Sequence, residues 1–259
     1  MEIYDGRQLL IYLAVKYDGD YDKIYMASVL KEQPPFEEVM RVNMSLKCRV
    51  LTLMDYDYPQ KLKQIYRPPL VLFYYGDITL LDKPTLGVVG AREYSEYGKY
   101  CAEKIIGEVI NGRVLVSGLA KGIDTIAHQC AIKNGGRTIA VLGSGIDNCY
   151  PTENQELYEE IKKNHLVISE YPGLSEPEAK HFPMRNRIVV ALSDGIYIPQ
   201  INSYMSGTMI SYSQAVNLNK PVFVAPDSIT SETINNQLID EGAIFTIDGE
   251  TIRYELRWK

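Results

Sequence analysis

Residues that bind metals or form disulfide bridges are scarce in this sequence. It contains four cysteines and three histidines among 259 residues. The cysteines, at positions 48, 101, 130 and 149, are far apart, and none belongs to a Cys-x-x-Cys pair. Because zinc sites draw their ligands from closely spaced pairs of such residues, we expect no metal site. Cys101 and Cys130 fall on apolar faces of expected helices, where cysteine typically behaves as a small buried hydrophobic residue.

Long apolar runs and an excess of positive charge are also missing. No stretch approaches the roughly 20 apolar residues of a membrane-spanning helix, and the chain does not open on a basic start followed by an apolar segment. We therefore expect a cytoplasmic protein with no membrane association. The formal net charge is -6, so nucleic acid would have to bind a local cluster of cations rather than the field of the whole molecule.

Common motifs of coenzyme-dependent and hydrolytic enzymes are absent as well. No Gly-x-Gly-x-x-Gly segment follows the first strand of the expected sheet, and no Gly-x-x-x-x-Gly-Lys-Ser/Thr loop occurs. A dinucleotide coenzyme and a P-loop are therefore not expected. The Gly-x-Ser-x-Gly turn that presents a nucleophilic serine and the His-Glu-x-x-His zinc motif are also lacking. We predict no cofactor and no catalytic residue.

The first part of the chain divides into two regions. Residues 1–50 favour a small domain of short helices, because apolar residues recur at helical spacing, as at Leu9 and Leu13. Residues 51–85 are interrupted by prolines and are expected to form a connecting segment, with one strand at Leu70–Tyr75.

The third region, residues 86–250, alternates short apolar runs with helical stretches. Helical spacing is clearest at Ile123, Ile126, Ala127 and Cys130, which fall on one helix face. Apolar strands alternating with helices indicate βαβ units, so we predict an α/β, Rossmann-like fold whose mostly parallel sheet carries helices on both faces. The expected strands are Leu86–Gly90, Arg113–Ser117, Thr138–Leu142, His165–Glu170, Gly195–Ile198, Pro221–Ala225 and Ala243–Ile247.

Cations, glycines and small polar residues follow the expected strands. In an open parallel sheet, ligands bind outside the carboxyl ends of the strands. Glycine lets backbone N–H groups approach an anion closely, and the start of the next helix adds a partial positive charge. These loops therefore predict a phosphate-binding site in which the backbone amides of Gly90 and Gly118 orient phosphates and cationic side chains neutralise them. The predicted cations are Arg92, Lys121, Arg185 and Arg187.

The segment from Lys180 to Arg187 supplies the local basic cluster that the overall acidity requires. It holds three cations and no acid. Arg185 and Arg187 follow Pro183 at the expected start of a helix, where positive charge opposes the helix dipole unless an anion lies nearby. Phe182, in the same segment, is either a core residue or a platform on which a base stacks.

Taken in order, these loops resemble the signature segments of the DNA processing protein A (DprA/Smf) family. The matching segments are Val89–Arg92, Ser117–Asp124, Ala127-His128, Val141–Gly145, Tyr150-Pro151, Asn154, Ser169–Pro172 and His181–Ile188. The resemblance extends from about residue 52 to residue 243. It implies a homodimeric, Rossmann-like protein that binds single-stranded DNA through a positively charged pocket. It also implies a role in loading the RecA recombinase onto incoming strands during natural transformation.

Carried over residue by residue, the resemblance implies which positions contact DNA. The implied DNA- and phosphate-binding residues are Gly90, Arg92, Ser117, Gly118, Lys121, Arg185, Asn186, Arg187, Ser206, Gly207 and Thr208. Four positions depart from the family pattern. Ala91 replaces a hydroxyl residue, Gln200 replaces a glutamate, and Asp227 and Ile234 each stand where a glycine is usual. These departures affect the edge of the expected pocket more than its phosphate-binding loops.

Two other functions fit the same kind of loops. Nucleoside-5'-monophosphate phosphoribohydrolases share the fold and carry a Pro-Gly-Gly-x-Gly-Thr-x-x-Glu segment. The nearest segment here is Tyr204–Ser211, in which Ser211 takes the place of the catalytic glutamate. A sensor that binds a small nucleotide in the same pocket is the other alternative. Because the catalytic carboxylate is missing, we expect a binding protein rather than an enzyme.

Overall fold

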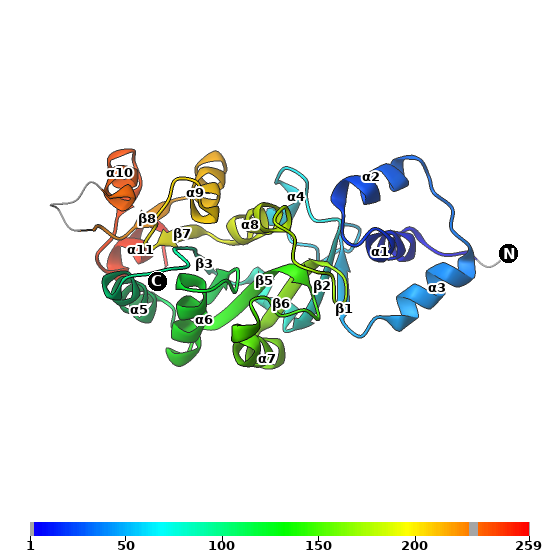
Figure 1. Cartoon of the computed structure of the whole chain (residues 1–259), viewed down its shortest axis with the longest axis horizontal. Helices are drawn as coiled ribbons and strands as arrows, with labels where there is room; N and C mark the ends of the chain where they lie inside the picture. Colours follow the sequence, from blue (N-terminus) through cyan, green and yellow to red (C-terminus); the bar gives the residue numbers. More distant parts are fainter. Residues whose placement is uncertain (1–2, 228–232, 259) are drawn as a thin grey trace.

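Nine strands form one sheet in this computed structural model, which describes residues 3–227 and 233–258. The strands are β1 (Arg49–Thr52), β2 (Val71–Gly76), β3 (Thr85–Val88), β4 (Val114–Ser117), β5 (Arg137–Gly145), β6 (Leu166–Tyr171), β7 (Gly195–Ile198), β8 (Val222–Val224) and β9 (Ile244–Phe245). Their order across the sheet is β1-β2-β6-β5-β4-β3-β7-β8-β9 (Figure 1). β2 pairs antiparallel with β1 and with β6, and all other neighbours are parallel. The predicted mostly parallel, Rossmann-like sheet is confirmed.

The seven strands β3 to β9 overlap the seven apolar runs expected after residue 85, and β2 overlaps the strand expected at Leu70–Tyr75. The sequence pattern does not predict β1. Only four residues pair in this strand, and only Leu51 and Thr52 of them are buried. Together β1 and β2 bring residues between 49 and 76 into the sheet, at its edge.

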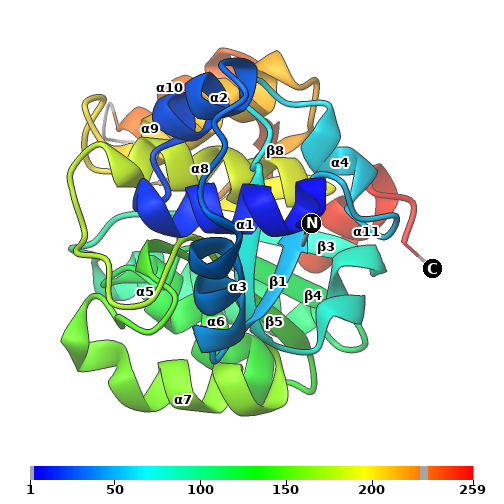
Figure 2. The same ribbon diagram turned by 90° about the vertical axis from the view of Figure 1, so that its right-hand side faces the viewer.

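Helices cover both faces of the sheet (Figures 1 and 2). One face carries α4 (Gln60–Lys63), α8 (His181–Leu192), α9 (Gly207–Asn217) and α10 (Ile234–Asp240), and the other carries α5 (Glu96–Val109), α6 (Ile123–Lys133), α7 (Gln155–Asn164) and α11 (Gly249–Glu255). Alternate residues of each strand serve the two faces. Val114 and Val116 of β4 pack in the core with α8, and Leu115 packs in the core with α5 and α6. Cys101 and Cys130 are both buried in this second core, as expected.

Three helices precede the sheet: α1 (Gly6–Lys16), α2 (Tyr21–Val29) and α3 (Phe36–Ser45). They lie at the end of the molecule next to β1 (Figure 1). A reciprocal cap starts α1, since the Asp5 carboxylate accepts the Gln8 N–H at 2.7 Å and the Gln8 side chain accepts the Asp5 N–H at 2.9 Å. Leu13 of α1 and Phe73 of β2 are buried in one cluster, so these predicted helices share a core with the sheet. No helix in the described ranges is long and apolar enough to cross a membrane.

The chain changes direction across the sheet between β3 and β7. From β3 it moves outward through β4 and β5 to β6, and it then returns to the other side of β3 to form β7, β8 and β9. The helix that follows β3 is α5, on one face, and the helix that follows β7 is α9, on the opposite face. The loops after these two neighbouring strands therefore diverge and leave a crevice at their carboxyl ends, where ligands of such sheets bind.

Candidate functional site

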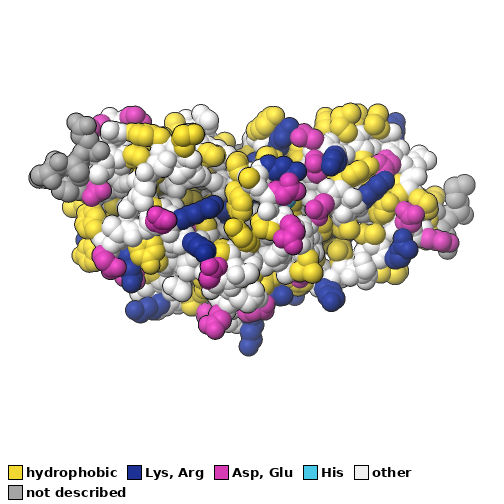
Figure 3. All heavy atoms as spheres, viewed as in Figure 1, with side chains coloured by type: hydrophobic (Ala, Val, Ile, Leu, Met, Phe, Trp, Pro, Cys, Tyr) yellow, Lys and Arg dark blue, Asp and Glu magenta, His cyan; other side chains and the backbone are white. Residues whose placement is uncertain are grey.

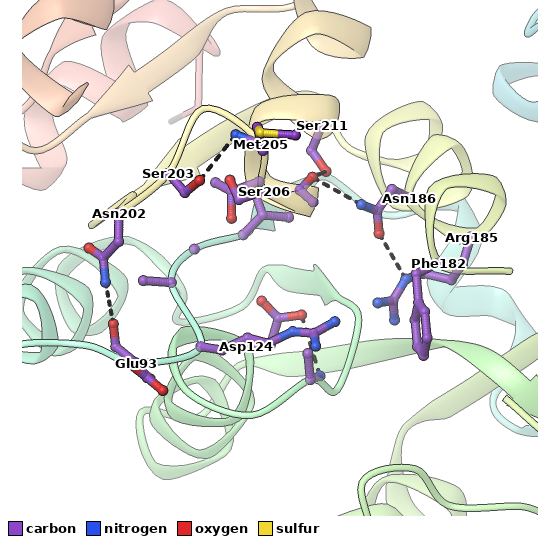
Figure 4. Close-up of a pocket in the computed structure, with 17 residues that line it drawn as sticks. Glu93, Asp124, Phe182, Arg185, Asn186, Asn202, Ser203, Met205, Ser206 and Ser211 are labelled. Atoms are coloured by element: carbon purple, nitrogen blue, oxygen red, sulfur yellow. Dashed lines mark hydrogen bonds between the residues drawn. The ribbon is translucent and has the colours of Figure 1, made fainter. Parts of the chain in front are cut away.

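A pocket of about 480 Å³ opens at this point of the sheet (Figure 4). Its walls come from the loops after β3 and β4, the first two turns of α8, and the segment that joins β7 to α9. Seven of the predicted phosphate-binding residues line it: Gly90, Arg92, Arg185, Asn186, Ser206, Gly207 and Thr208. The other four, Ser117, Gly118, Lys121 and Arg187, do not line it.

Two glycines let the loop after β3 pack directly against the start of α6. A Cβ on Gly90 would lie 2.7 Å from the side chain of Ile123. A Cβ on Gly122, whose φ is +83°, would lie 2.4 Å from the Ala91 carbonyl oxygen. The Ile123 N–H donates to that same carbonyl at 3.1 Å. This close approach, which side chains would prevent, holds Arg92 at the mouth of the pocket.

Arg92 is the exposed cation of the pocket. Its side chain forms no ion pair with any carboxylate in the described part of the chain. The guanidinium carbon lies 5.7 Å from the centre of the Phe182 ring, a position that favours a cation–π interaction. Its charge is therefore available to an anion that enters the pocket.

Arg185 is a buried cation that lines the same pocket. Its guanidinium donates to the carbonyl oxygens of Gly118 and Val141, the latter at 2.7 Å, and its Nε donates to Asn186 Oδ1 at 3.0 Å. The Asn186 side chain in turn donates to the Gly207 carbonyl at 3.1 Å (Figure 4). Burial lowers the pKa of Arg185, and the nearby carboxylate of Asp124 opposes this change. Arg185 thus contributes charge to the pocket from a fixed position.

Asp124, which sequence reasoning did not assign to the pocket, organises the loop after β4. Its carboxylate accepts the N–H groups of Gly118 at 3.2 Å and Ala120 at 3.4 Å. Burial raises the pKa of Asp124, and Arg185 and these two N–H groups oppose the rise. The Ser117 hydroxyl donates to the Val88 carbonyl at 2.7 Å. The Ser117 hydroxyl and the Gly118 N–H group thus have acceptors within the protein, and their contacts with phosphate stay a prediction.

Arg187 lies away from the pocket, in a buried ion pair. Its guanidinium is 2.7 Å from the Glu170 carboxylate on β6, and both side chains are less than a tenth exposed. Burial raises the pKa of Glu170, and Arg187 opposes that rise. The sequence-based argument placed Arg185 and Arg187 at the start of a helix. α8 instead begins at His181, so both arginines lie in its second turn and the helix-dipole argument does not apply to them.

Lys121 is exposed beside the pocket and forms an ion pair with Glu153, from the loop after β5. Both side chains are more than half exposed. A surface pair of this kind contributes only about 0–1 kcal/mol, so the lysine can be released to another anion.

The start of α9 faces the pocket. The Ser206 hydroxyl caps this helix by accepting the Met209 N–H at 3.3 Å. Gly207 and Thr208 are its first residues, and the N–H groups at this position of a helix have no acceptor within the helix. They provide hydrogen-bond donors and a partial positive charge for an anion.

Phe182 lies at the pocket wall and is half-buried. Its ring centre is 5.7 Å from the guanidinium carbon of Arg92 and 5.9 Å from that of Arg185. The structure therefore places this ring in the pocket wall beside two cations, and base stacking on it stays a prediction.

Of the four departures from the family pattern, Gln200 takes a structural role beside the pocket. Gln200 joins two loops, since its carbonyl accepts the Ala91 N–H and its side chain accepts the Ser95 N–H, both at 2.9 Å. Ala91 lines the pocket, whereas Gln200, Asp227 and Ile234 do not. Other lining residues missed by sequence reasoning are Glu93, Asn202, Ser203, Met205 and Ser211. In the described ranges no group of three or more His, Cys, Asp or Glu side chains is placed to hold a metal ion.

The fold and the pocket define an α/β protein of the Rossmann-like class with an anion-attracting site at the switch point of its sheet. Comparison with known sequences identifies the family. Residues 49–257 match the family described as DNA recombination-mediator protein A. The chain belongs to this DNA processing protein A (DprA/Smf) family.

Two DprA sequences match most of the chain. The DNA processing protein DprA of Streptococcus pneumoniae is 41% identical over 209 residues, which are 80% of this chain and 74% of that protein. The DprA of Bacillus subtilis is 37% identical over 243 residues, 91% of this chain and 82% of that protein.

Solved structures of two DprA proteins share the architecture. The S. pneumoniae structure superimposes with a TM-score of 0.77 at 34% identity and covers 96% of this chain and 93% of that chain. The structure of Helicobacter pylori DprA, described for its mode of binding single-stranded DNA, gives a TM-score of 0.73 at 33% identity and covers 82% of this chain and 97% of that chain.

Proposed function

We propose that this protein binds the phosphate backbone of single-stranded DNA without sequence preference. The observation that carries the proposal is Arg92, an exposed cation with no ion-pair partner in the described ranges, at the mouth of a pocket that also contains Arg185. The start of α9 adds N–H donors from the opposite wall. The H. pylori relative, whose structure concerns binding of single-stranded DNA, supports the choice of ligand.

The proposed contacts are local rather than spread over the surface. On the face shown in Figure 3, Lys and Arg side chains are interspersed with Asp and Glu side chains over the coloured residues. With a net charge of -6, the molecule as a whole does not attract a polyanion. Arg92 and Arg185 neutralise phosphates at the pocket, and the N–H groups of Gly207 and Thr208 orient these phosphates. Lys121 contacts the DNA strand after its ion pair with Glu153 breaks.

We further propose that the protein acts as a binding module rather than an enzyme. Ser211 stands where the phosphoribohydrolase segment has its glutamate, and its hydroxyl donates to the Gly207 carbonyl at 3.2 Å. A homodimer would present two pockets to one strand and raise the avidity through effective concentration. In this proposal the dimer holds incoming strands during natural transformation and passes them to a RecA recombinase.

The binding proposal is tested by fluorescence anisotropy with a labelled single strand of about 20 nucleotides, longer than the sites of about 4–16 nucleotides found in other single-strand-binding folds. Arg92→Ala should weaken binding to every sequence alike. Arg41→Ala is the matched control, because Arg41 is also exposed but lies on α3, at the far end of the molecule.

Unlabelled duplex and AMP serve as competitors. The proposal expects weak competition by both and strong competition by single-stranded DNA. No binding of single strands, together with tight binding of AMP, would overturn the proposal and favour a nucleotide-binding enzyme or sensor.

A further inference from the structure

A second aromatic ring extends the pocket wall beyond Phe182. The ring centre of Tyr150 lies 5.9 Å from that of Phe182, and the two ring planes are inclined by 42°. Tyr150 is not among the residues that line the pocket, whereas Phe182 is, so the two rings join the pocket wall to a ring outside the lining. Tyr150 is 45% exposed, which leaves its ring accessible to a ligand. We call these two rings the aromatic ledge.

The backbone beneath the aromatic ledge is tightly held. A Cβ on Gly143 would lie 2.9 Å from the Phe182 ring, so this ring rests directly on the backbone of β5. The loop that carries Tyr150 is fixed by the Ser144 hydroxyl, which donates to the Asn148 carbonyl at 2.6 Å. Cys149, the preceding residue, is buried. An aromatic ring presented on a fixed backbone loses little conformational freedom when a ligand stacks on it.

The two flanks of the pocket differ in charge. Beyond Arg92 along the chain, Glu93 and Glu96 are both exposed and would repel a phosphate backbone. On the side of the aromatic ledge, the loop after β5 carries two acids. Asp147 accepts the Tyr75 hydroxyl at 2.7 Å, and the charge of Glu153 is compensated by Lys121. A strand held in the pocket therefore meets less repulsion across the aromatic ledge than along the start of α5.

We propose that Tyr150 and Phe182 form a stacking site for consecutive bases of the strand whose phosphates occupy the pocket. The strand leaves the pocket across α8 towards the loop after β5. Every base has a π-face, so stacking on two neighbouring rings adds affinity without sequence preference. The inference rests on the proposed function and adds the position of the bases and the direction of the strand.

The test compares Tyr150→Ala, Tyr150→Phe and Tyr254→Ala. Tyr254 is a matched control, because it is 82% exposed and lies on α11. Tyr150→Ala should weaken binding of a thymidine strand by about 5- to 150-fold, the range found for loss of one stacked base. Tyr150→Phe and Tyr254→Ala should bind as the wild type does. A strand of the same length without bases should bind Tyr150→Ala and the wild type equally.

A fluorescence measurement gives a second readout that does not depend on affinity. The chain has one tryptophan, Trp258, which packs against Arg113. A Tyr150→Trp variant in a Trp258→Phe background then reports only from position 150. Stacking predicts quenching by the thymidine strand at saturation and none by the strand without bases.

The outcomes separate the two proposals. If the wild type binds single strands tightly but Tyr150→Ala binds equally well and position 150 is not quenched, the stacking site is wrong and the phosphate pocket stands. If the wild type does not bind single strands at all, the proposed function fails and the stacking site fails with it.

Discussion

The guanidinium of Arg185 lies directly against the backbone of Gly118, and no side chain fits between them. A Cβ at position 118 would sit 2.3 Å from Arg185 Nη1. That nitrogen donates to the carbonyl oxygens of Gly118 and Val141, which belong to segments 67 and 44 residues away in the sequence. The contact fixes a buried cation beneath the pocket, so the loop after β4 shapes the site even though Gly118 does not line it.

Replacing Gly118 tests this contact. Gly118→Ala forces Arg185 to move and should lower the free energy of unfolding by about 1–3 kcal/mol, as overpacking of a tight site does. Binding of single-stranded DNA should weaken as well, although no charge is removed. Gly107→Ala is the control, because a Cβ there meets nothing nearer than 3.6 Å and alanine favours the helix. Urea denaturation measures both variants, and a Gly118→Ala protein as stable as the wild type would refute the contact.

The ion pair of Arg187 and Glu170 should matter for stability rather than for binding. Arg187→Ala leaves Glu170 buried without its partner and should cost about 3–5 kcal/mol of unfolding free energy. The double variant Arg187→Met/Glu170→Leu should lose much less. Folded Arg187→Ala protein should still bind single strands with wild-type affinity. A specific loss of DNA binding in a stable Arg187→Ala protein would restore the phosphate-contact role predicted from the sequence.

The stability of Arg187→Ala should depend on pH. Burial raises the pKa of Glu170 and Arg187 lowers it, so removing Arg187 raises it further. The buried carboxyl of the variant then takes up a proton in the folded state as the pH falls, which removes the unpaired charge. Unfolding curves from about pH 8 to pH 5 should show the stability deficit of Arg187→Ala shrinking with acid. A deficit that grows with acid would contradict this account.

His128 should make the protein sensitive to acid. Its Nδ1 is 2.6 Å from the Thr138 hydroxyl oxygen, and burial lowers its pKa to about 3. Below the ordinary histidine pKa of about 6.5, the unfolded chain therefore binds a proton that the folded chain does not bind. The free energy of unfolding then decreases by up to about 1.4 kcal/mol for each unit by which the pH is lowered. His128→Gln should flatten the dependence between about pH 6.5 and pH 4. An unchanged slope would show that other groups cause it.

Glu153 should compete with DNA for Lys121. Because the exposed pair contributes only about 0–1 kcal/mol, Glu153→Gln should raise the affinity for single-stranded DNA by up to about fivefold. Lys121→Ala should then reduce affinity more in the Glu153→Gln background than in the wild type. Glu103→Gln, an exposed carboxylate on α5, controls for the change in net charge. An equal gain in DNA affinity from both glutamine variants would mean that Glu153 does not compete with DNA for Lys121.

The alternation of apolar runs and helical spacing predicts the sheet and its helices. A strand such as β4, which is buried on both faces, needs a continuous apolar run, and such a run is visible in the sequence. The same reasoning misses β1, whose four residues carry too short a pattern. Residue types after the strands also locate the pocket. They do not reveal which cations face it. Arg187 is paired with Glu170 across the fold, and Arg185 with two distant carbonyls. Such partners are brought together by tertiary packing and leave no local signal.

The central claim is that Arg92 contacts phosphate directly. The most direct measurement is the salt dependence of single-strand binding for the wild type and Arg92→Ala, between about 50 and 200 mM salt. Direct contact predicts that the variant binds more weakly and that the slope of log affinity against log salt concentration becomes shallower by about 0.7, the value for one phosphate on a single strand. Equal slopes for the two proteins, or a variant whose preference among bases changes, would contradict the account.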